Sequence, residues 1–195
     1  ADFVATGGNE SHWQDAWFGN GGTVYSSTRE VQSRIPMTGC VGNHEVMSDS
    51  NASRTRLYYP MNWADGNGGA TLAYYTFTYG PVQVLVLDSQ RGSSNNTQKN
   101  WATSVLQNSD KTFKIATYHQ PCYSAGGSHS DSESQMANMR NNFAPIFINY
   151  GCKLTFAGHN HYYNRSLVNG VQHVTAGGLG AAENTPGGAT GQQAS

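Results

Sequence analysis

Two histidines one residue apart, His159 and His161, stand in the segment Gly158-His159-Asn160-His161. This segment follows residues 153–157, a short apolar run that indicates a buried strand. Imidazoles on a loop that leaves a strand can reach two points in space, or two neighbouring metal ions. An isolated H-x-H pair is more often two surface histidines in a turn. The chemical interpretation therefore depends on residues elsewhere in the chain.

Two other predicted strand ends carry matching chemistry. Residues 35–41 run into Gly42-Asn43-His44-Glu45, and residues 113–118 deliver His119, with His129 ten residues later in a Gly/Ser-rich loop. An asparagine oxygen is an ordinary ligand for a divalent metal, and a histidine can bind a metal or donate to an anion. Read singly, Gly-Asn is typical of a turn, His119 could be a core residue and His129 a surface residue.

Taken together, these loops offer one oxygen and three imidazole ligands from three strand ends. This is the constellation expected of a dinuclear hydrolytic site, in which two metals share a hydroxide and clamp a phosphate. The candidate metal ligands are Asn43, His119, His159 and His161.

The elements that must position these loops alternate between strands and helices, which predicts an α/β layered domain. In such sheets ligands bind beyond the carboxyl ends of the strands, where the polar motifs lie. The predicted strands are residues 2–6, 35–41, 113–118, 153–157 and 170–176, together with a hairpin of residues 73–79 and 82–88. The predicted helices are residues 97–107 and 134–150, the second kinked at Pro145, and residues 24–34 form a helix or loop.

The order of these motifs resembles the calcineurin-like metallophosphoesterases, and among them the purple acid phosphatases. The shared features are G-N-H-E, H-x-P-x-Y-S, G-H-x-H followed by a near A-Y-x-R-S, the hairpin of residues 75–88 and a Q-x-x-W helix start at residues 98–101. The resemblance covers about residues 1–183, leaving a tail of residues 184–195 rich in Gly, Ala, Thr and Gln. It implies an αββα sandwich of two mixed sheets flanked by helices and incomplete at both ends.

The resemblance also implies roles for individual residues. Asn43, His119 and His159 match the ligands of the family's divalent metal, and His161 matches a ligand of its first, typically ferric, metal. His44 and His129 match the histidines that steady the phosphate and assist the leaving group. The implied cofactors are divalent zinc, manganese or iron in a dinuclear Fe–Zn type site. The implied reaction is hydrolysis of a phosphate monoester by a metal-activated hydroxide.

The match fails on one side of the site. Where the family has G-D-x-x-Y, the chain reads Gly7-Gly8-Asn9-Glu10-Ser11, so Gly8 replaces the bridging aspartate and Ser11 the tyrosine. The sequence therefore leaves three interpretations open. They are an acid phosphatase, a catalytically inactive extracellular binding or structural module with the same fold, and a mononuclear zinc-binding domain. Restoring aspartate at Gly8 is predicted to raise metal affinity if the rest of the site is intact.

Composition limits the partners and the location. With 195 residues, a formal net charge of -1 and 12% charged residues, the chain gives no reason to expect nucleic acid or a membrane surface as partner. Low charge and four sequons, beginning at Asn9, Asn51, Asn95 and Asn164, indicate an extracellular glycoprotein. Cys40, Cys122 and Cys152 allow one disulfide without fixing the pair. Exposed sheet edges could be covered by another copy or a partner chain.

Overall fold

The computed structural model describes residues 2–20, 26–64, 72–178 and 182–187, and one mixed six-stranded sheet lies at the centre of this part. The strand order is β1-β2-β3-β4-β6-β5. Strands β2, β3, β4 and β6 run parallel to one another, and the edge strands β1 and β5 pair antiparallel with β2 and β6. The strands are β1 (Tyr75–Tyr79), β2 (Val82–Val86), β3 (Phe113–Thr117), β4 (Leu154–Ala157), β5 (Tyr163–Val168) and β6 (Val171–Ala176).

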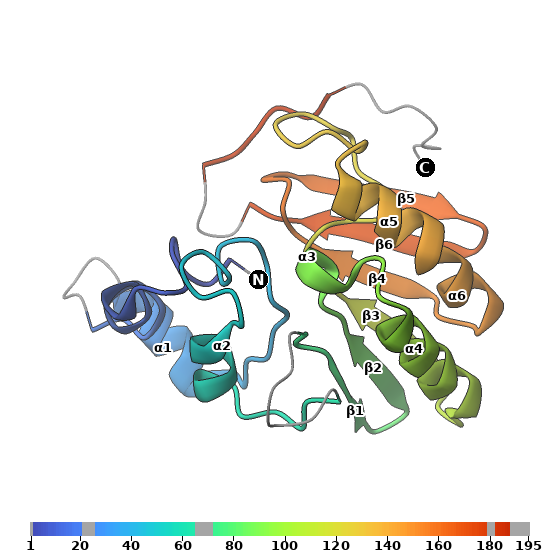
Figure 1. Cartoon of the computed structure of the whole chain (residues 1–195), viewed down its shortest axis with the longest axis horizontal. Coiled ribbons are helices and arrows are strands. Elements are labelled where there is room, and N and C mark those ends of the chain that lie inside the picture. The colour runs from blue at the N-terminus through green and yellow to red at the C-terminus, as the bar shows by residue number, and fades with distance from the viewer. Residues whose placement is uncertain (1, 21–25, 65–71, 179–181, 188–195) are drawn as a thin grey trace.

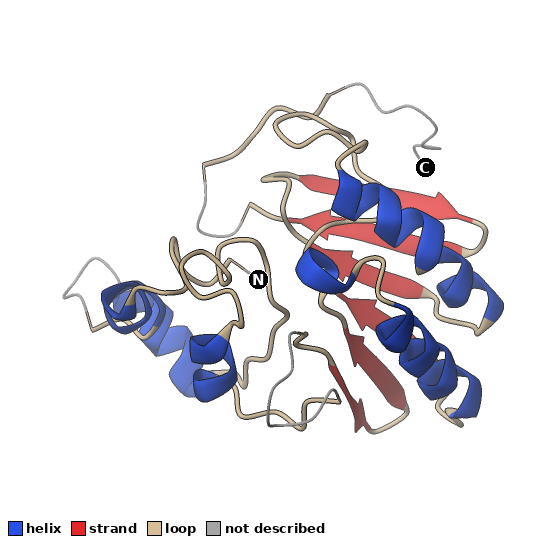
Figure 2. Ribbon diagram, viewed as in Figure 1, coloured by secondary structure: helices blue, strands red, loops and turns tan. Residues whose placement is uncertain are grey.

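One face of the sheet is covered by the helices α3 to α6, as Figures 1 and 2 show. Their bounds are α3 (Ser89–Gly92), α4 (Asn96–Asn108), α5 (Ser134–Asn142) and α6 (Ala144–Asn149). Alternate residues of the strands point into this layer, so that Leu85 and Ala116 pack with Leu106 and Phe147 in one fully buried cluster. The helices thereby hold β2, β3 and β4 rigid up to the ends from which the polar loops leave.

The N-terminal third packs on the other face of β1 and β2. It contains the π-helix η1 (His12–Trp17) and the helices α1 (Ser26–Arg34) and α2 (Ser53–Tyr58). Trp13 and Val41 form a second core with Tyr75 of β1 and Val86 of β2. Beyond β2 this face carries exposed apolar side chains, whose exposed fractions are 55% for Phe113, 42% for Phe156, 68% for Tyr163 and 47% for Leu167.

Several predicted elements are confirmed, namely the hairpin, the strands β3, β4 and β6, and helix α4. The predicted helix over residues 134–150 is two helices, because α5 ends at Asn142 and Pro145 stands in the first turn of α6. The α/β class and the mixed sheet with flanking helices are as expected, and the described residues contain one sheet of the expected sandwich. The tail from residue 188 onwards lies outside the described residues.

The strands predicted at residues 2–6 and 35–41 are wrong. Both segments are irregular in the structure. The backbone N–H groups of Asp2 and Phe3 donate to the buried Glu45 carboxylate at 2.9 and 2.6 Å rather than to a neighbouring strand. Residues 35–38 are exposed, and this apolar run therefore lacks the burial that its sequence pattern predicts.

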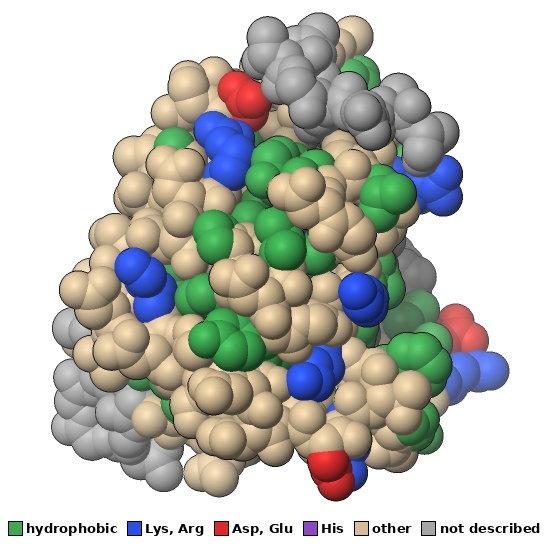
Figure 3. All heavy atoms as spheres, turned by 90° about the vertical axis from the view of Figure 1, so that its right-hand side faces the viewer, with side chains coloured by type: hydrophobic (Ala, Val, Ile, Leu, Met, Phe, Trp, Pro, Cys, Tyr) green, Lys and Arg blue, Asp and Glu red, His purple; other side chains and the backbone are tan. Residues whose placement is uncertain are grey.

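The remaining surface carries few charges. Figure 3 shows one face on which apolar and uncharged side chains dominate, with isolated basic and acidic groups and no visible histidine. All three cysteines are buried free thiols, so the disulfide that the sequence allows does not form. Among the described residues no helix has the length and apolar character needed to span a membrane.

Candidate functional site

Two parallel strands deliver the central histidines. His119 follows β3, and His159 follows β4 after Gly158. The N–H of Gly158 donates to the carbonyl of His119 at 2.9 Å, which continues the pairing of the two strands and holds the loops side by side. His159 has a positive φ of 69°, a left-handed conformation that costs free energy for any residue with a side chain. This backbone turn directs the His159 ring toward His119, and the ring centroids lie 5.0 Å apart.

Three polar atoms converge on one nitrogen of His119. Its Nε2 lies 2.8 Å from Oδ1 of Asn43 and 3.1 Å from Oδ2 of Asp2. It also lies 3.2 Å from Nδ1 of His159. A ring nitrogen of a neutral imidazole has either one proton or one lone pair, so it cannot form a good hydrogen bond with all three atoms. The opposite nitrogen, Nδ1 of His119, is buried and has no hydrogen-bond partner among the described residues.

The loop that carries Asn43 is fixed by Glu45. The Glu45 side chain is fully buried, and its carboxylate accepts hydrogen bonds from the N–H groups of Asp2, Phe3 and Gly42. A side chain at Gly42 would not fit, since its Cβ would lie 2.6 Å from Asp2 Oδ1 and 2.8 Å from His119 Cγ. Glu45 and Gly42 therefore let Asp2 reach His119 and hold it there.

A second buried group fixes the backbone of His119. The Ser89 hydroxyl oxygen accepts hydrogen bonds from the N–H groups of His119 and Gln120 at 3.0 and 2.9 Å, and the hydroxyl donates to Gln120 Oε1 at 2.5 Å. Ser89 follows Asp88, which is the N-cap of α3 and accepts from the N–H of Arg91. The end of β2 thus supports the loop that leaves the neighbouring strand β3.

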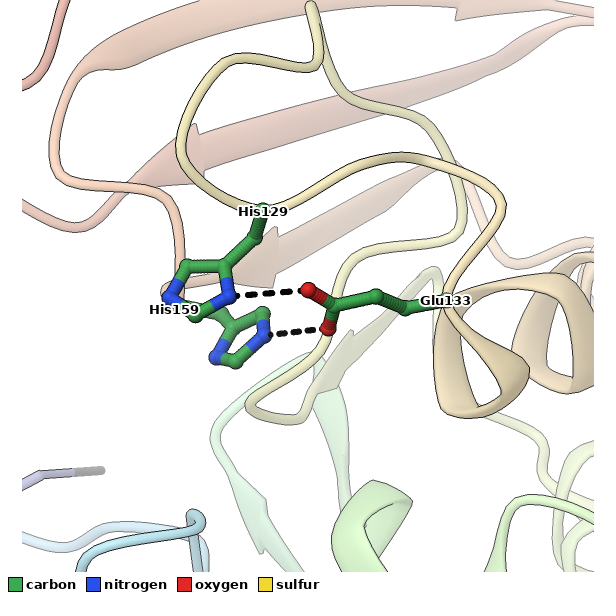
Figure 4. A group of neighbouring side chains, drawn as sticks. All are labelled: His129, Glu133 and His159. Carbon is green, nitrogen blue, oxygen red and sulfur yellow. Dashed lines mark hydrogen bonds and ion pairs between the residues drawn. The ribbon is translucent and has the colours of Figure 1, made fainter.

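Glu133 joins the other side of His159 to His129, as Figure 4 shows. Its Oε2 lies 2.9 Å from Nε2 of His159, and its Oε1 lies 2.9 Å from Nδ1 of His129. The two imidazole rings stack with centroids 3.7 Å apart and planes inclined by 28°. The N–H of His129 also donates to Oδ1 of Asn160 at 3.3 Å, which ties its loop to the loop after β4.

The protonation states of the central residues suit metal ligands. Burial raises the pKa of Asp2, but hydrogen bonding and charge interaction with His119 outweigh burial and lower this pKa to about 2. Burial, together with the charge of His119, lowers the pKa of His159 to about 4, although the hydrogen bond to Glu133 opposes the shift. At neutral pH Asp2 is a carboxylate and His159 a neutral imidazole, the forms that coordinate cations.

The predicted residues fall into three groups. The structure brings Asn43, His119 and His159 together and connects His129 to them through Glu133. The other two predicted histidines make different contacts. Nδ1 of His44 donates to the carbonyl of Ala5 at 2.8 Å, and Nδ1 of His161 donates to the carbonyl of Ala182 at 3.1 Å. These bonds leave Nε2 of each ring available, and neither ring makes a hydrogen bond to the central cluster among the described residues. The backbone N–H of His44 does donate to Oδ1 of Asp2, at 3.3 Å.

Sequence reasoning missed the two carboxylates, Asp2 and Glu133. The apolar pattern places Asp2 in a strand, and no short motif links it to residues more than forty positions away. Glu133 stands four residues after His129 and directly before a helix, which is a spacing that brings side chains together on a helical turn. That spacing is the signal that could have found it.

The backbone at Gly8 leaves no room for the side chain of the aspartate that the sequence resemblance leads one to expect there. A Cβ there would lie 2.2 Å from the carbonyl oxygen of Ser48, and the N–H of Gly8 donates to the carbonyl of Met47 at 2.8 Å. The next residue, Asn9, directs its Oδ1 to the N–H and hydroxyl of Ser11. The expectation that aspartate at Gly8 would raise metal affinity therefore conflicts with this geometry.

The donor set fits one divalent cation. The carboxylate of Asp2, the amide oxygen of Asn43 and the facing nitrogens of His119 and His159 provide two oxygens and two nitrogens from four segments of the chain. Mixed imidazole and oxygen ligands suit zinc and related metals. A cation among these atoms would also resolve their convergence on a single nitrogen. On the side of His161, the described residues offer no comparable set of ligand atoms.

The sequence matches the model of the calcineurin-like phosphoesterase family over residues 2–163, and the chain belongs to this family. Membership implies use of divalent metals. An uncharacterised protein of Mycobacterium tuberculosis is 26% identical over 193 residues, which cover 89% of this chain and 33% of that protein. Phosphoenolpyruvate phosphatase of Allium cepa is 29% identical over 182 residues, covering 85% of this chain and 37% of that enzyme. Purple acid phosphatase 15 of Arabidopsis thaliana is 24% identical over 145 residues, which cover 70% of this chain and 26% of that enzyme.

The chain spans about a third of the length of these relatives. Solved structures share its fold. One is GAP50, described as the anchor in the inner membrane complex of Plasmodium, with a TM-score of 0.67, 18% identity and coverage of 97% of this chain and 62% of that one. Another is the purple acid phosphatase PPD1 of yellow lupin, with a TM-score of 0.57, 18% identity and coverage of 78% of this chain and 30% of that one.

Proposed function

We propose that this domain, residues 1–183, hydrolyses phosphoric monoesters with the help of one divalent metal ion. The observation that carries the proposal is the convergence of Asp2, Asn43 and His159 on Nε2 of His119, at distances of 3.1, 2.8 and 3.2 Å. These four residues are the proposed metal ligands. Kinship with phosphoenolpyruvate phosphatase and purple acid phosphatases supports a phosphate ester as substrate.

A bound divalent ion supplies Lewis acidity toward a phosphoryl oxygen and can lower the pKa of a water molecule. The chain supplies the groups around it. His129 is proposed to bind the phosphate and protonate the leaving group as an imidazolium, in which Nδ1–H donates to Glu133 and Nε2–H is directed to the substrate. His44 is proposed to assist it, since its Nδ1 is engaged by Ala5. His161, whose Nε2 is available, is the proposed ligand if a second ion binds beside the first.

The decisive experiment measures metal and turnover together. The purified protein is loaded with zinc, manganese or ferrous iron, the metal content is measured by inductively coupled plasma mass spectrometry, and p-nitrophenyl phosphate hydrolysis is followed. We expect about one ion per chain and turnover that a chelator abolishes. Asn43→Ala should lose both, whereas the control Asn100→Ala, on the exposed surface of α4, should lose neither. A protein that takes up no ion and hydrolyses nothing would refute the proposal.

A second candidate is a non-catalytic module of the same fold. The crowded backbone at Gly8 favours it, because the bridging carboxylate of a dinuclear site has no room there. Its solved neighbour GAP50 is described as an anchor. Uptake of one ion without turnover would select this candidate over the hydrolase.

We also propose that the protein is secreted and glycosylated. Asn9 and Asn51 are exposed and open to modification, whereas Nδ2 of Asn164 donates to Ser166 and Oδ1 of Asn95 caps α4. Deglycosylation that leaves the mass unchanged, for protein produced in a secreting eukaryotic host, would contradict this.

The exposed apolar face beyond β2 and the edge strands β1 and β5 support association with a second copy of the chain. Light scattering that gives the mass of a monomer at micromolar concentration would argue against it.

A further inference from the structure

We infer that Glu133 is a positioning residue that fixes the protons of His159 and His129. It thereby couples the metal ligand to the phosphate-binding histidine, an inference that rests on the function proposed above. Each of its two carboxylate oxygens faces a different histidine, at 2.9 Å in both cases (Figure 4). The family resemblance gives no role to this residue, and its carboxylate makes no other hydrogen bond among the described residues.

The first consequence concerns His159. An ionised carboxylate can only accept hydrogen bonds, so the proton of the neutral His159 ring must be on Nε2, where Glu133 lies. The lone pair is then on Nδ1, the nitrogen that faces Nε2 of His119 at 3.2 Å. Glu133 thus keeps the inner nitrogen of His159 free of a proton. This arrangement, in which a carboxylate orients a histidine whose other nitrogen binds the metal, raises metal affinity in other sites.

The second consequence concerns His129. Its Nδ1 carries a proton that is donated to Oε1 of Glu133, so Nε2 is the nitrogen available to a substrate. The hydrogen bond from the N–H of His129 to Asn160 holds the loop in the same place. The two rings stack with centroids 3.7 Å apart, and one carboxylate accepts a hydrogen bond from each of them. One side chain therefore sets the donor pattern on both sides of the site.

An alternative use of the same atoms is a cation bound directly by His129, Glu133 and His159, whose ligand atoms lie within 4.8 Å of one another. Proton counting disfavours it. Binding a cation at Nε2 would move the His159 proton to Nδ1, which would then point at Nε2 of His119. Nε2 of His119 would then have to accept a hydrogen bond from His159. Two other acceptors, Asn43 Oδ1 and Asp2 Oδ2, face the same nitrogen and would be left without a donor. If Glu133 instead accepts the His159 proton, Nε2 of His119 can donate to these oxygens.

Substitution at Glu133 is a clean perturbation. The residue precedes α5, yet its side chain makes no capping hydrogen bond, so Glu133→Gln removes no helix cap. Glutamine keeps the shape but replaces one accepting oxygen by a donating NH₂ group, and it can satisfy only one of the two histidines. Asp131→Asn is the matched control. It removes a carboxylate from the same loop, and this carboxylate contacts Arg140 rather than either histidine.

The test combines nitrogen-15 NMR of the histidine rings in the metal-free protein with zinc titration by calorimetry. We expect wild type and Asp131→Asn to show the Nε2–H form of His159 and the Nδ1–H form of His129. In Glu133→Gln at least one of these patterns should be lost, and zinc affinity should fall about 10- to 100-fold, the range for residues that orient metal ligands. Glu133→Asp, which retains two accepting oxygens, should recover part of the loss.

The outcomes separate this inference from the proposed function. Unchanged ring patterns in Glu133→Gln would overturn the positioning role. Two zinc ions per wild-type chain, one of them lost in Glu133→Gln, would overturn it in favour of direct coordination. If wild type binds no zinc but the ring patterns change with Glu133→Gln, the function fails and the positioning of the two histidines stands.

Discussion

Placing an aspartate at Gly8 should destabilise the domain rather than restore a metal site. A Cβ added at this residue would lie 2.2 Å from the Ser48 carbonyl oxygen and 2.7 Å from the Ser48 Cβ. An ordinary contact would need the two segments to separate by about 1 Å. They are held together by hydrogen bonds of 2.8 Å from Gly7 to His44 and from Gly8 to Met47. Overpacking costs about 1–3 kcal/mol, and each strained backbone hydrogen bond adds about 1 kcal/mol.

We therefore expect Gly8→Asp to lower the free energy of unfolding by about 3 kcal/mol, a large part of the stability of a typical domain. Urea unfolding followed by circular dichroism measures this change, and zinc calorimetry reports on the site. Asn9→Asp is the matched control, because it adds the same charge at the next residue, where the side-chain oxygen already accepts from Ser11. It should change stability by less than about 0.5 kcal/mol. Gly8→Asp with wild-type stability and tighter zinc binding would refute the reasoning.

Buried groups lead to three further predictions. Asp2→Asn removes a charged ligand and should weaken zinc binding by at least about 10- to 100-fold, the range for residues that only orient a ligand. Unchanged zinc affinity by calorimetry would exclude Asp2 from the site. Burial lowers the pKa of His173 to about 4, so the unfolded chain binds its proton first as the pH falls. The contribution of neutral His173 to the free energy of unfolding should be complete above about pH 6.5 and should fall by up to about 3 kcal/mol as the pH approaches 4. In urea unfolding at a series of pH values, His173→Gln should lose less stability over this range than the wild type. Ser89→Ala removes a hydroxyl that contacts two backbone N–H groups, and it should cost about 1–3 kcal/mol in thermal unfolding; no change in Tm would contradict that role.

The sequence predicts the second half of the fold better than the first. From residue 73 onwards, apolar runs such as β2 and β3 alternate with polar helix surfaces, and local pattern and tertiary burial agree. Residues 2–6 and 35–41 carry similar apolar runs, but they lack strands for different reasons. The carboxylate of Glu45 binds the N–H groups of Asp2 and Phe3, which a sheet would have used, whereas residues 35–38 are exposed. A side chain that replaces a strand partner leaves no periodic signal, and an apolar run does not by itself reveal whether it is buried.

The site is predictable to the extent that strands deliver it. Asn43, His119 and His159 follow short motifs whose spacing is visible in the chain, and their convergence rests on parallel neighbours β3 and β4. Asp2 depends on a loop path that the sequence does not encode in any short pattern, and Glu133 is signalled only by its spacing of four residues from His129. These two residues supply the negative charge of the cluster, and an account built on the motifs alone misses it.

Charge decides what this site can hold. With only Asn43 and neutral imidazoles, a divalent cation would be bound by dipoles, and affinity would be weak. Asp2 adds a full charge in direct contact with His119, and Glu133 adds a second one behind His159. Neither carboxylate comes from Gly8, so the negative charge of the proposed site comes from Asp2 and Glu133. This distribution of charge supports the proposal of one cation held by Asp2, Asn43, His119 and His159.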